Sequence, residues 1–101
     1  MLILPIKKQW FDLIKQGIKK EEYREIKPYY TTRFTNLGLL ENGNPTNKEI
    51  VVLFRNGYSQ KSPSFQAICT LSIDKKDSKY ACWGAVTDKT YYVLTIKKLM
   101  V

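Results

Sequence analysis

The chain has 101 residues, which is the size of one domain, and 44% of them are hydrophobic, enough for one modest core. Its formal net charge is +8, with eight basic and four acidic residues in positions 1–36 and nine and five in the remainder. A spread positive charge favours polyanions such as RNA or DNA, although a solvated basic surface without a partner has the same composition. The absence of histidine excludes Ser-His-Asp and Cys-His catalysis and the commonest zinc ligand.

The first elements expected are a short strand and a helix. Residues 2–6 form an apolar run typical of a strand, and residues 7–16 then take helical spacing, with Trp10 in the buried stripe. Gly17 follows the last periodic residue, where a left-handed residue commonly ends a helix. We therefore expect a strand, an amphipathic helix and a glycine cap in the first 17 residues.

A second strand and helix are expected next. Alternation over residues 20–27 predicts a strand in which Glu22 and Arg24 share one face, where they can form an ion pair. A proline then begins a short helix over residues 28–34. Residues 36–48 are rich in Asn, Gly and Pro, which predicts a surface loop.

The second half of the chain is expected to be mainly β-structure. Strands are predicted at 50–54, 65–73 and 90–96, with a charged turn at 74–79. Lys97-Lys98, at the end of the last strand, can protect a sheet edge from aggregation. The sequence thus predicts a single α+β domain over residues 1–101, mainly β, in which a small open barrel has one or two short helices across its openings.

Cysteine usage and the N-terminal segment bear on the cellular compartment. Cys69 lies in an apolar strand pattern and is expected to be a buried free thiol, which suits a reducing cytosol. The apolar opening is too short for a signal peptide or a membrane span. We expect a cytoplasmic protein without a membrane partner. No motif indicates a metal or an organic cofactor.

One short stretch concentrates charged residues between the predicted first helix and second strand. It reads G-x-K-x-x-E-x-R, with Gly17, Lys19, Glu22 and Arg24 at the fixed positions. In this spacing and position the chain resembles the ASCH (activating signal cointegrator homology) family of the PUA-like superfamily, and residues 83–85 are similar to a segment of its small bacterial and phage-encoded members. The resemblance covers nearly the whole chain. It implies a PUA-like open β-barrel with a cleft suited to RNA or to a modified nucleoside or nucleotide.

The resemblance also implies an enzymatic alternative. Some members of the family hydrolyse the acetyl amide of N4-acetylcytidine, and Lys19 matches the lysine of their site. Glu22 stands where these hydrolases have a threonine. If the chain is such an amidohydrolase, Lys19 and Glu22 are the candidate catalytic residues; a metal-independent ribonuclease of the same fold is a further alternative.

The residues themselves leave the environment of Lys19 open. Lys19 is an odd number of residues from Glu22, so strand alternation does not place the two on the same face. Lys19 must therefore reach Glu22 from the turn after Gly17. A desolvated lysine beside Arg24 would have a lowered pKa and could act as a base, whereas a lysine beside Glu22 would stay charged. A solvated loop lysine and an exposed Glu22–Arg24 pair at the barrel mouth are the simpler interpretation.

Aromatic residues next to cations form a second candidate set. Tyr29, Tyr30 and Trp83 flank the motif or turns and are the candidates for stacking on bases, together with the motif residues. Most other rings are expected to fill the core, because a small barrel needs large side chains inside. Residues 55–58 form a predicted turn with a cation and a ring, either an RNA-facing loop or an ordinary hairpin.

Overall fold

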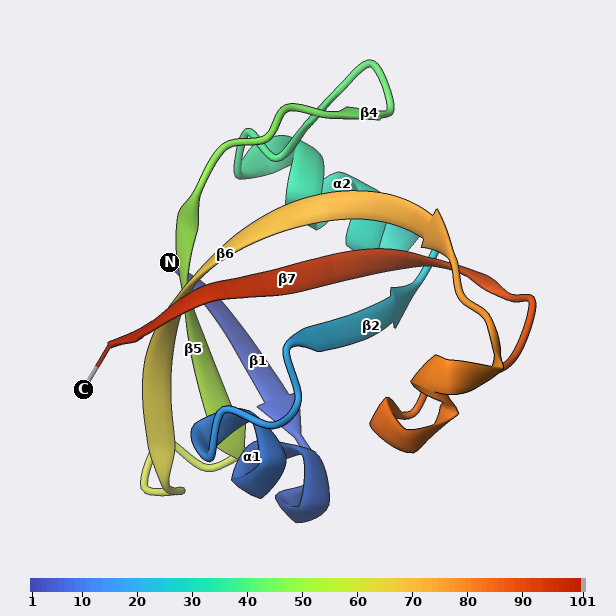
Figure 1. Ribbon diagram of the computed structural model, residues 1–101. Coiled ribbons are helices and arrows are strands. Elements are labelled where there is room, and N and C mark those ends of the chain that lie inside the picture. The colour runs from blue at the N-terminus through green and yellow to red at the C-terminus, as the bar shows by residue number, and fades with distance from the viewer. Residues whose placement is uncertain (101) are drawn as a thin grey trace.

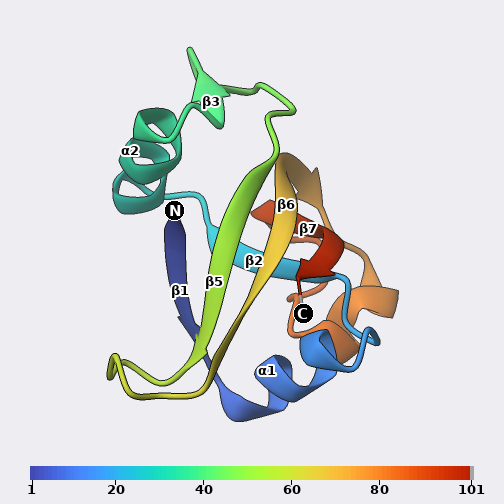
Figure 2. The ribbon, with the colours of Figure 1, turned by 90° about the vertical axis from the view of Figure 1, so that its left-hand side faces the viewer.

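A single curled sheet of five strands dominates the computed structural model, which describes residues 1–100 (Figures 1 and 2). The strand order is β1-β5-β6-β7-β2; β1 pairs parallel to β5, and the other neighbours are antiparallel. The strands of this sheet are β1 (Leu2–Ile6), β2 (Glu21–Glu25), β5 (Ile50–Asn56), β6 (Ser64–Lys75) and β7 (Thr90–Met100). The sheet curls into an open half-barrel, which confirms the predicted α+β, mainly-β fold.

Two short α-helices lie at opposite ends of the curled sheet (Figure 1). Helix α1 (Lys8–Lys15) buries Phe11 and Ile14, which lie one turn apart and therefore face the same side. The helix ends at Lys15, and Gly17, two residues later, has a φ of +78°, the left-handed residue that the sequence predicts after the helix. Helix α2 (Pro28–Asn36) starts at its proline and buries Phe34. One helix thus covers each opening of the barrel.

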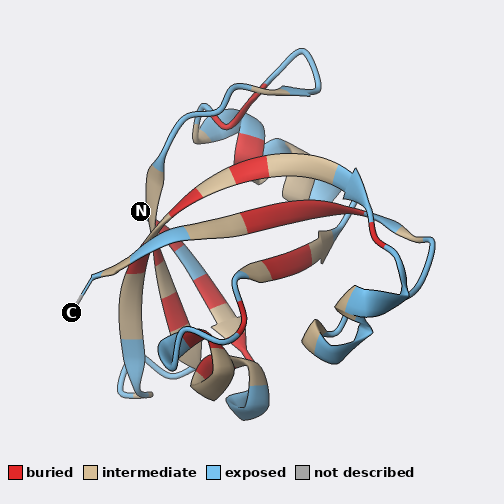
Figure 3. Cartoon of the chain, viewed as in Figure 1, coloured by how far each residue is buried: buried red, intermediate tan, exposed pale blue. Residues whose placement is uncertain are grey.

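The core consists of two unequal clusters separated by β2 and β7. The larger one fills the inside of the curl, with Phe34, Phe54 and Leu94 almost fully buried (Figure 3). The smaller one contains Tyr23, Tyr91 and Val93 and is partly covered by Tyr80 and Trp83. Cys69 is a buried free thiol in the larger cluster, as predicted.

A 3-10 helix, η1 (Ser78–Trp83), covers the smaller cluster and is a feature that the sequence did not predict. The expected turn at 74–79 is instead the end of β6 followed by the start of η1, where the Asp77 side chain accepts a hydrogen bond from the Lys79 backbone. Buried Lys76 forms an ion pair of 3.0 Å with Glu21. This pair ties the segment before η1 to β2.

Two further differences concern the loop at 36–48 and the last strand. The loop contains a two-residue hairpin, β3 (Leu40–Glu41) with β4 (Asn44–Pro45). Strand β7 continues to Met100, whereas β2 pairs only with its residues 91–95. Lys97 and Lys98 therefore lie within β7, on a stretch that β2 leaves unpaired. None of the helices in residues 1–100 has the length and apolar character needed to cross a bilayer.

The two edge strands of the curled sheet are linked by a side chain. Arg24 on β2 donates from Nη2 to the carbonyl oxygen of Pro5 on β1 over 3.2 Å. Farther along β1, Arg33 of α2 donates to the carbonyl oxygen of Ile3 over 3.5 Å. Arg24 thus spans the open side of the barrel from β2 to β1, and Arg33 links α2 to β1.

Candidate functional site

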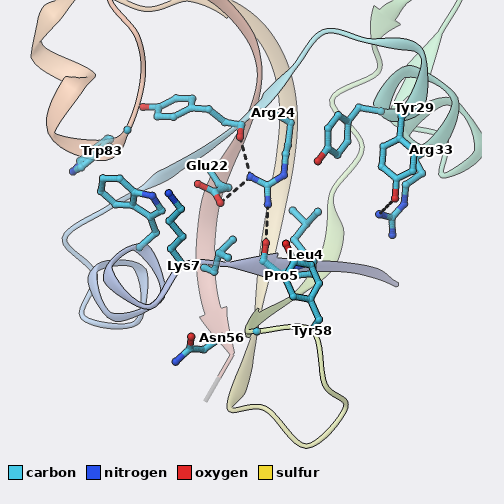
Figure 4. A pocket seen from close by; sticks show the side chains of 16 residues that line it. Leu4, Pro5, Lys7, Glu22, Arg24, Tyr29, Arg33, Asn56, Tyr58 and Trp83 are labelled. Carbon is cyan, nitrogen blue, oxygen red and sulfur yellow. Dashed lines mark hydrogen bonds and ion pairs between the residues drawn. The ribbon is translucent and has the colours of Figure 1, made fainter.

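A pocket of about 670 Å³ lies at the open side of the barrel (Figure 4). Its walls come from the end of β1, the start of α1, β2, α2, the turn between β5 and β6, and the end of η1. A pocket of this volume is in the range of sites that take a small organic ligand, roughly 300–1,000 Å³. The position follows from the fold, because a half-barrel leaves space between its two edge strands.

The structure brings most of the predicted site residues to this one pocket. Its lining includes Glu22, Arg24, Tyr29, Tyr30 and Trp83. Lys19, the remaining predicted site residue, does not line the pocket: its side chain is fully buried and lies behind Glu22. The motif is therefore split into two pocket residues and one lysine in a layer beneath them.

Glu22 and Arg24 form the floor of the pocket as a hydrogen-bonded pair. Arg24 Nη1 lies 2.9 Å from Glu22 Oε2, which confirms the predicted ion pair, and also donates to the carbonyl oxygen of Tyr23. The exposed fractions of the two side chains are 15% for Arg24 and 6% for Glu22, so the pair is largely withdrawn from solvent. Such a pair interacts more strongly than an exposed one.

Arg24 keeps two of its five N–H groups free of partners within residues 1–100. Both Nη1 protons and one Nη2 proton are used, on Glu22, Tyr23 and Pro5. The Nε proton and the second Nη2 proton remain. In Figure 4 the Arg24 guanidinium stands in the middle of the pocket, with Glu22 on one side and the tyrosine side chains of α2 on the other. A guanidinium fixed in this way can present donors to a ligand without losing its internal partners.

The Lys19 ammonium joins the floor of the pocket to one of its walls. Nζ lies 3.2 Å from Glu22 Oε1 and donates to the carbonyl oxygens of Glu21 and Trp83, the latter over 2.9 Å. The rings of Trp10 and Tyr23 lie 5.2 and 4.8 Å from Nζ, within range of cation–π attraction. All of these groups are arranged around a positive charge.

Both environments considered for Lys19 are present together. Burial lowers the pKa of Lys19 below its ordinary value, and Arg24 acts in the same direction, while Glu22 opposes them. Because Glu22 binds Lys19 through one oxygen and Arg24 through the other, both of its oxygens are engaged. Glu22 is thus a carboxylate held in place by two cations.

Aromatic rings form the walls. Tyr30 lies next to the Arg24 guanidinium, with 6.0 Å from the ring centroid to Cζ, and Tyr29 packs against Tyr30 edge to face at 5.0 Å. Trp83 stands on the η1 side, and Tyr58, 90% exposed, stands on the β5–β6 turn. The turn predicted at 55–58 begins only after Asn56, where β5 ends. Asn56, Gly57 and Tyr58 line the pocket, whereas Arg55 does not.

Several residues that line the pocket lie outside the predicted site set, among them Trp10, Arg33 and Lys7. Trp10, expected in the buried stripe of its helix, is half-buried: it packs against the core and also lines the pocket. Arg33 lies one helical turn after Tyr29, and this i, i+4 spacing was a usable signal. Lys7 follows β1 directly, and nothing in its local pattern indicates the pocket.

The description of the pocket gains nothing from metal-binding residues or from comparison with known proteins. Residues 1–100 contain no group of three or more Cys, Asp or Glu side chains that could hold a metal ion. Comparisons of the chain with protein-family models, with curated proteins and with solved structures found no match.

Proposed function

We propose that the pocket binds RNA or a nucleotide, and that the chain is a PUA-like module of the ASCH type. One observation carries this proposal. The motif residues Glu22 and Arg24, aromatic rings from several elements and two further cations all line a single cavity of about 670 Å³. Rings combined with cations are the usual means of holding an unstacked base and its phosphate.

The family assignment rests on where the motif residues lie. Gly17 follows the helix, Glu22 and Arg24 face the pocket, and Lys19 holds Glu22 from below. A sequence motif in which two charged residues face one cavity and a third holds one of them in place supports a ligand site more than a set of scattered surface charges does. Within this proposal Lys19 is a positioning residue, and Arg24 and the rings contact the ligand.

The test is binding of a labelled single-stranded RNA, measured by fluorescence anisotropy over a range of salt concentrations. Replacing Trp83 by leucine removes a stacking surface, which costs roughly 1–3 kcal/mol per base, or about 5- to 150-fold in affinity. Arg33→Gln removes a pocket cation and should weaken binding and reduce its salt dependence. Lys98→Gln removes the same charge outside the pocket and should have much less effect.

Circular dichroism would establish that each variant keeps its fold. RNA affinities of Trp83→Leu and Arg33→Gln equal to that of the wild type would exclude this pocket as the binding site.

The Lys19–Glu22 pair favours a second candidate function. A buried lysine with a lowered pKa next to a carboxylate is an arrangement that can relay a proton. The corresponding reaction is hydrolysis of an acylated nucleoside such as N4-acetylcytidine, with Glu22 as the group nearest the substrate. Chromatography of a nucleoside panel after incubation with excess protein tests it, and intact N4-acetylcytidine would exclude that substrate. Labelled RNA incubated in the same way with a chelator tests the ribonuclease alternative.

A further inference from the structure

We propose that the pocket selects a nucleotide with a terminal phosphate monoester, either a free mononucleotide or the phosphorylated end of an RNA, over the corresponding nucleoside. This inference rests on the proposed nucleotide-binding function and specifies its ligand. It comes from the number of positive and negative side chains around the cavity and from whether each of them already has a partner.

Cations outnumber carboxylates in the pocket lining. Lys7, Arg24 and Arg33 line it, and Glu22 is the one carboxylate among the described residues that do so. Glu22 is already paired on both oxygens, by Lys19 at 3.2 Å and by Arg24 at 2.9 Å. The positive charges of Lys7 and Arg33 therefore have no counterion within the cavity.

The cations approach the cavity from three directions. Arg24 lies on β2, Arg33 on α2, and Lys7 between β1 and α1. Figure 4 shows Arg24 in the centre, with Arg33 on the side of α2 and Lys7 on the opposite side. Because these cations lie on different elements, a phosphate, whose charged oxygens accept charge-assisted hydrogen bonds, has a possible donor on more than one wall of the cavity.

The donors of these groups are available. Arg24 retains its Nε proton and one Nη2 proton, as described above. Arg33 makes only long hydrogen bonds, 3.4 Å to the Tyr29 hydroxyl and 3.5 Å to the Ile3 carbonyl, so it can turn toward a stronger acceptor at little cost. A phosphate monoester offers three acceptor oxygens and a charge of about −1.5 to −2 at neutral pH.

A neutral nucleoside would fit this cavity less well for a physical reason. Its entry would displace water from the cations without supplying a charge in return. A nucleotide compensates that loss at the cations and can still place its base against Trp83, Tyr30 or Trp10. The same pocket therefore provides separate places for the base and for the phosphate.

Intrinsic tryptophan fluorescence provides a direct readout of occupancy. The chain has two tryptophans, Trp10 and Trp83, and both line the pocket. The four common nucleosides, their 5′- and 3′-monophosphates and inorganic phosphate would each be titrated, with calorimetry as a second measurement. We expect at least one monophosphate to bind about tenfold or more tightly than its nucleoside, the usual effect of a charge-assisted hydrogen bond.

Variants identify the groups responsible for this preference. Arg33→Gln and Lys7→Gln should each reduce the monophosphate-to-nucleoside affinity ratio toward one while changing nucleoside affinity little. Lys98→Gln, which lies outside the pocket, should leave the ratio unchanged. A short RNA with a 5′-phosphate, compared with the same RNA carrying a 5′-hydroxyl, shows whether the phosphate belongs to an RNA end or to a free mononucleotide. A preference for the phosphorylated RNA over the mononucleotide assigns the ligand to an RNA end, and the reverse assigns it to a free nucleotide.

Two results would overturn the inference while leaving the nucleotide pocket intact. One is equal affinity for a nucleoside and its monophosphates, with a tryptophan response to both. The other is a monophosphate-to-nucleoside ratio that Arg33→Gln and Lys7→Gln do not change. If no nucleoside, nucleotide or RNA binds, the proposed function itself fails, and the inference fails with it.

Discussion

Arg24 on β2 and Pro5 on β1 are joined by a hydrogen bond of 3.2 Å between Nη2 and the proline carbonyl oxygen. Their strands are the two edges of the curled sheet, so this bond spans the open side of the barrel. The same guanidinium holds Glu22 through Nη1. The arginine of the motif therefore has a structural role in addition to the ligand contact proposed for it.

Replacing Arg24 by glutamine should lower the free energy of unfolding by about 2–3 kcal/mol, because hydrogen bonds involving a charged group contribute roughly 1.5–3 kcal/mol each. Urea denaturation followed by circular dichroism measures this loss. Arg33→Gln is the matched control and should cost less than about 0.5 kcal/mol, since its hydrogen bonds are long and exposed. Equal effects of the two substitutions would show that the Arg24 bridge does not stabilise the barrel.

Lys19 and Glu22 should depend on each other for stability. Lys19→Met is expected to cost about 3–5 kcal/mol, because it leaves a buried carboxylate with one cation fewer and two carbonyl oxygens without their donor. Glu22→Gln should also destabilise. The double variant should lose less than the sum of the single losses, as a double-mutant cycle by urea denaturation would show. Additive losses would mean that the pair contributes no coupling energy.

Alanine at Gly84 should disturb the pocket through its contact with Trp10. It has a φ of +98°, and a Cβ built there lies 3.0 Å from Cζ2 of Trp10. Gly84→Ala should therefore cost more than the roughly 1–2 kcal/mol of a left-handed alanine and should shift the tryptophan emission. Gly17→Ala is the control, with a φ of +78° and nothing within 4 Å of the added Cβ. A similar loss in both variants would exclude a steric contribution from Trp10.

Tyr23 should make the protein less stable at alkaline pH. Burial and a hydrogen bond to Glu21 raise the pKa of Tyr23 above its ordinary value near 10. Above about pH 10 the folded state retains a proton that the unfolded state loses. The contribution of Tyr23 to the free energy of unfolding is therefore complete below about pH 10 and declines as the pH rises further. Tyr23→Phe should lower the free energy of unfolding by about 1 kcal/mol at neutral pH, but that free energy should then fall less steeply at alkaline pH. Denaturation series at several pH values measure both.

Tyr58→Phe is the matched control for this series, because it makes the same substitution at a tyrosine that is 90% exposed. A slope in Tyr23→Phe as steep as that of the wild type would show that another group causes the decline.

The two cysteines should differ in reactivity. Cys69 is fully buried, and burial raises the pKa of its thiol to about 12, whereas Cys82 is exposed. Because the thiolate is the reacting form, a disulfide reagent at mildly alkaline pH should modify Cys82 alone in the native protein and both cysteines in denaturant. Cys82→Ser should show no native reaction. Rapid native modification of Cys69 in that variant would contradict its burial.

Elements with a local signal were predictable from the sequence. Gly17 follows the end of a helix because glycine adopts a positive φ at low cost, and Pro28 starts one because its ring fixes φ. Alternation placed Glu22 and Arg24 on one face of β2, and their ion pair of 2.9 Å follows from it. These features depend on neighbours within a few residues of each other.

Features that depend on distant contacts were not predictable. Helix η1 covers a cluster whose members come from β2 and β7, and Lys76 before it pairs with Glu21, 55 positions earlier in the chain. The environment of Lys19 depends likewise on the carbonyl of Trp83, 64 residues away. Local patterning indicated a charged turn and a lysine with two possible environments, and only the fold brings their partners together.

The arginine contacts to β1 also bear on self-association. An edge strand exposes backbone groups to which a second chain can add, and β1 is such a strand. Pro5 has no N–H to offer, its carbonyl oxygen is bound by Arg24, and that of Ile3 is bound by Arg33. Strand addition along β1 would have to break these contacts first. Arg24, one of the residues that give the pocket its positive charge, thus also helps, together with Pro5, to keep the chain from polymerising through its first strand.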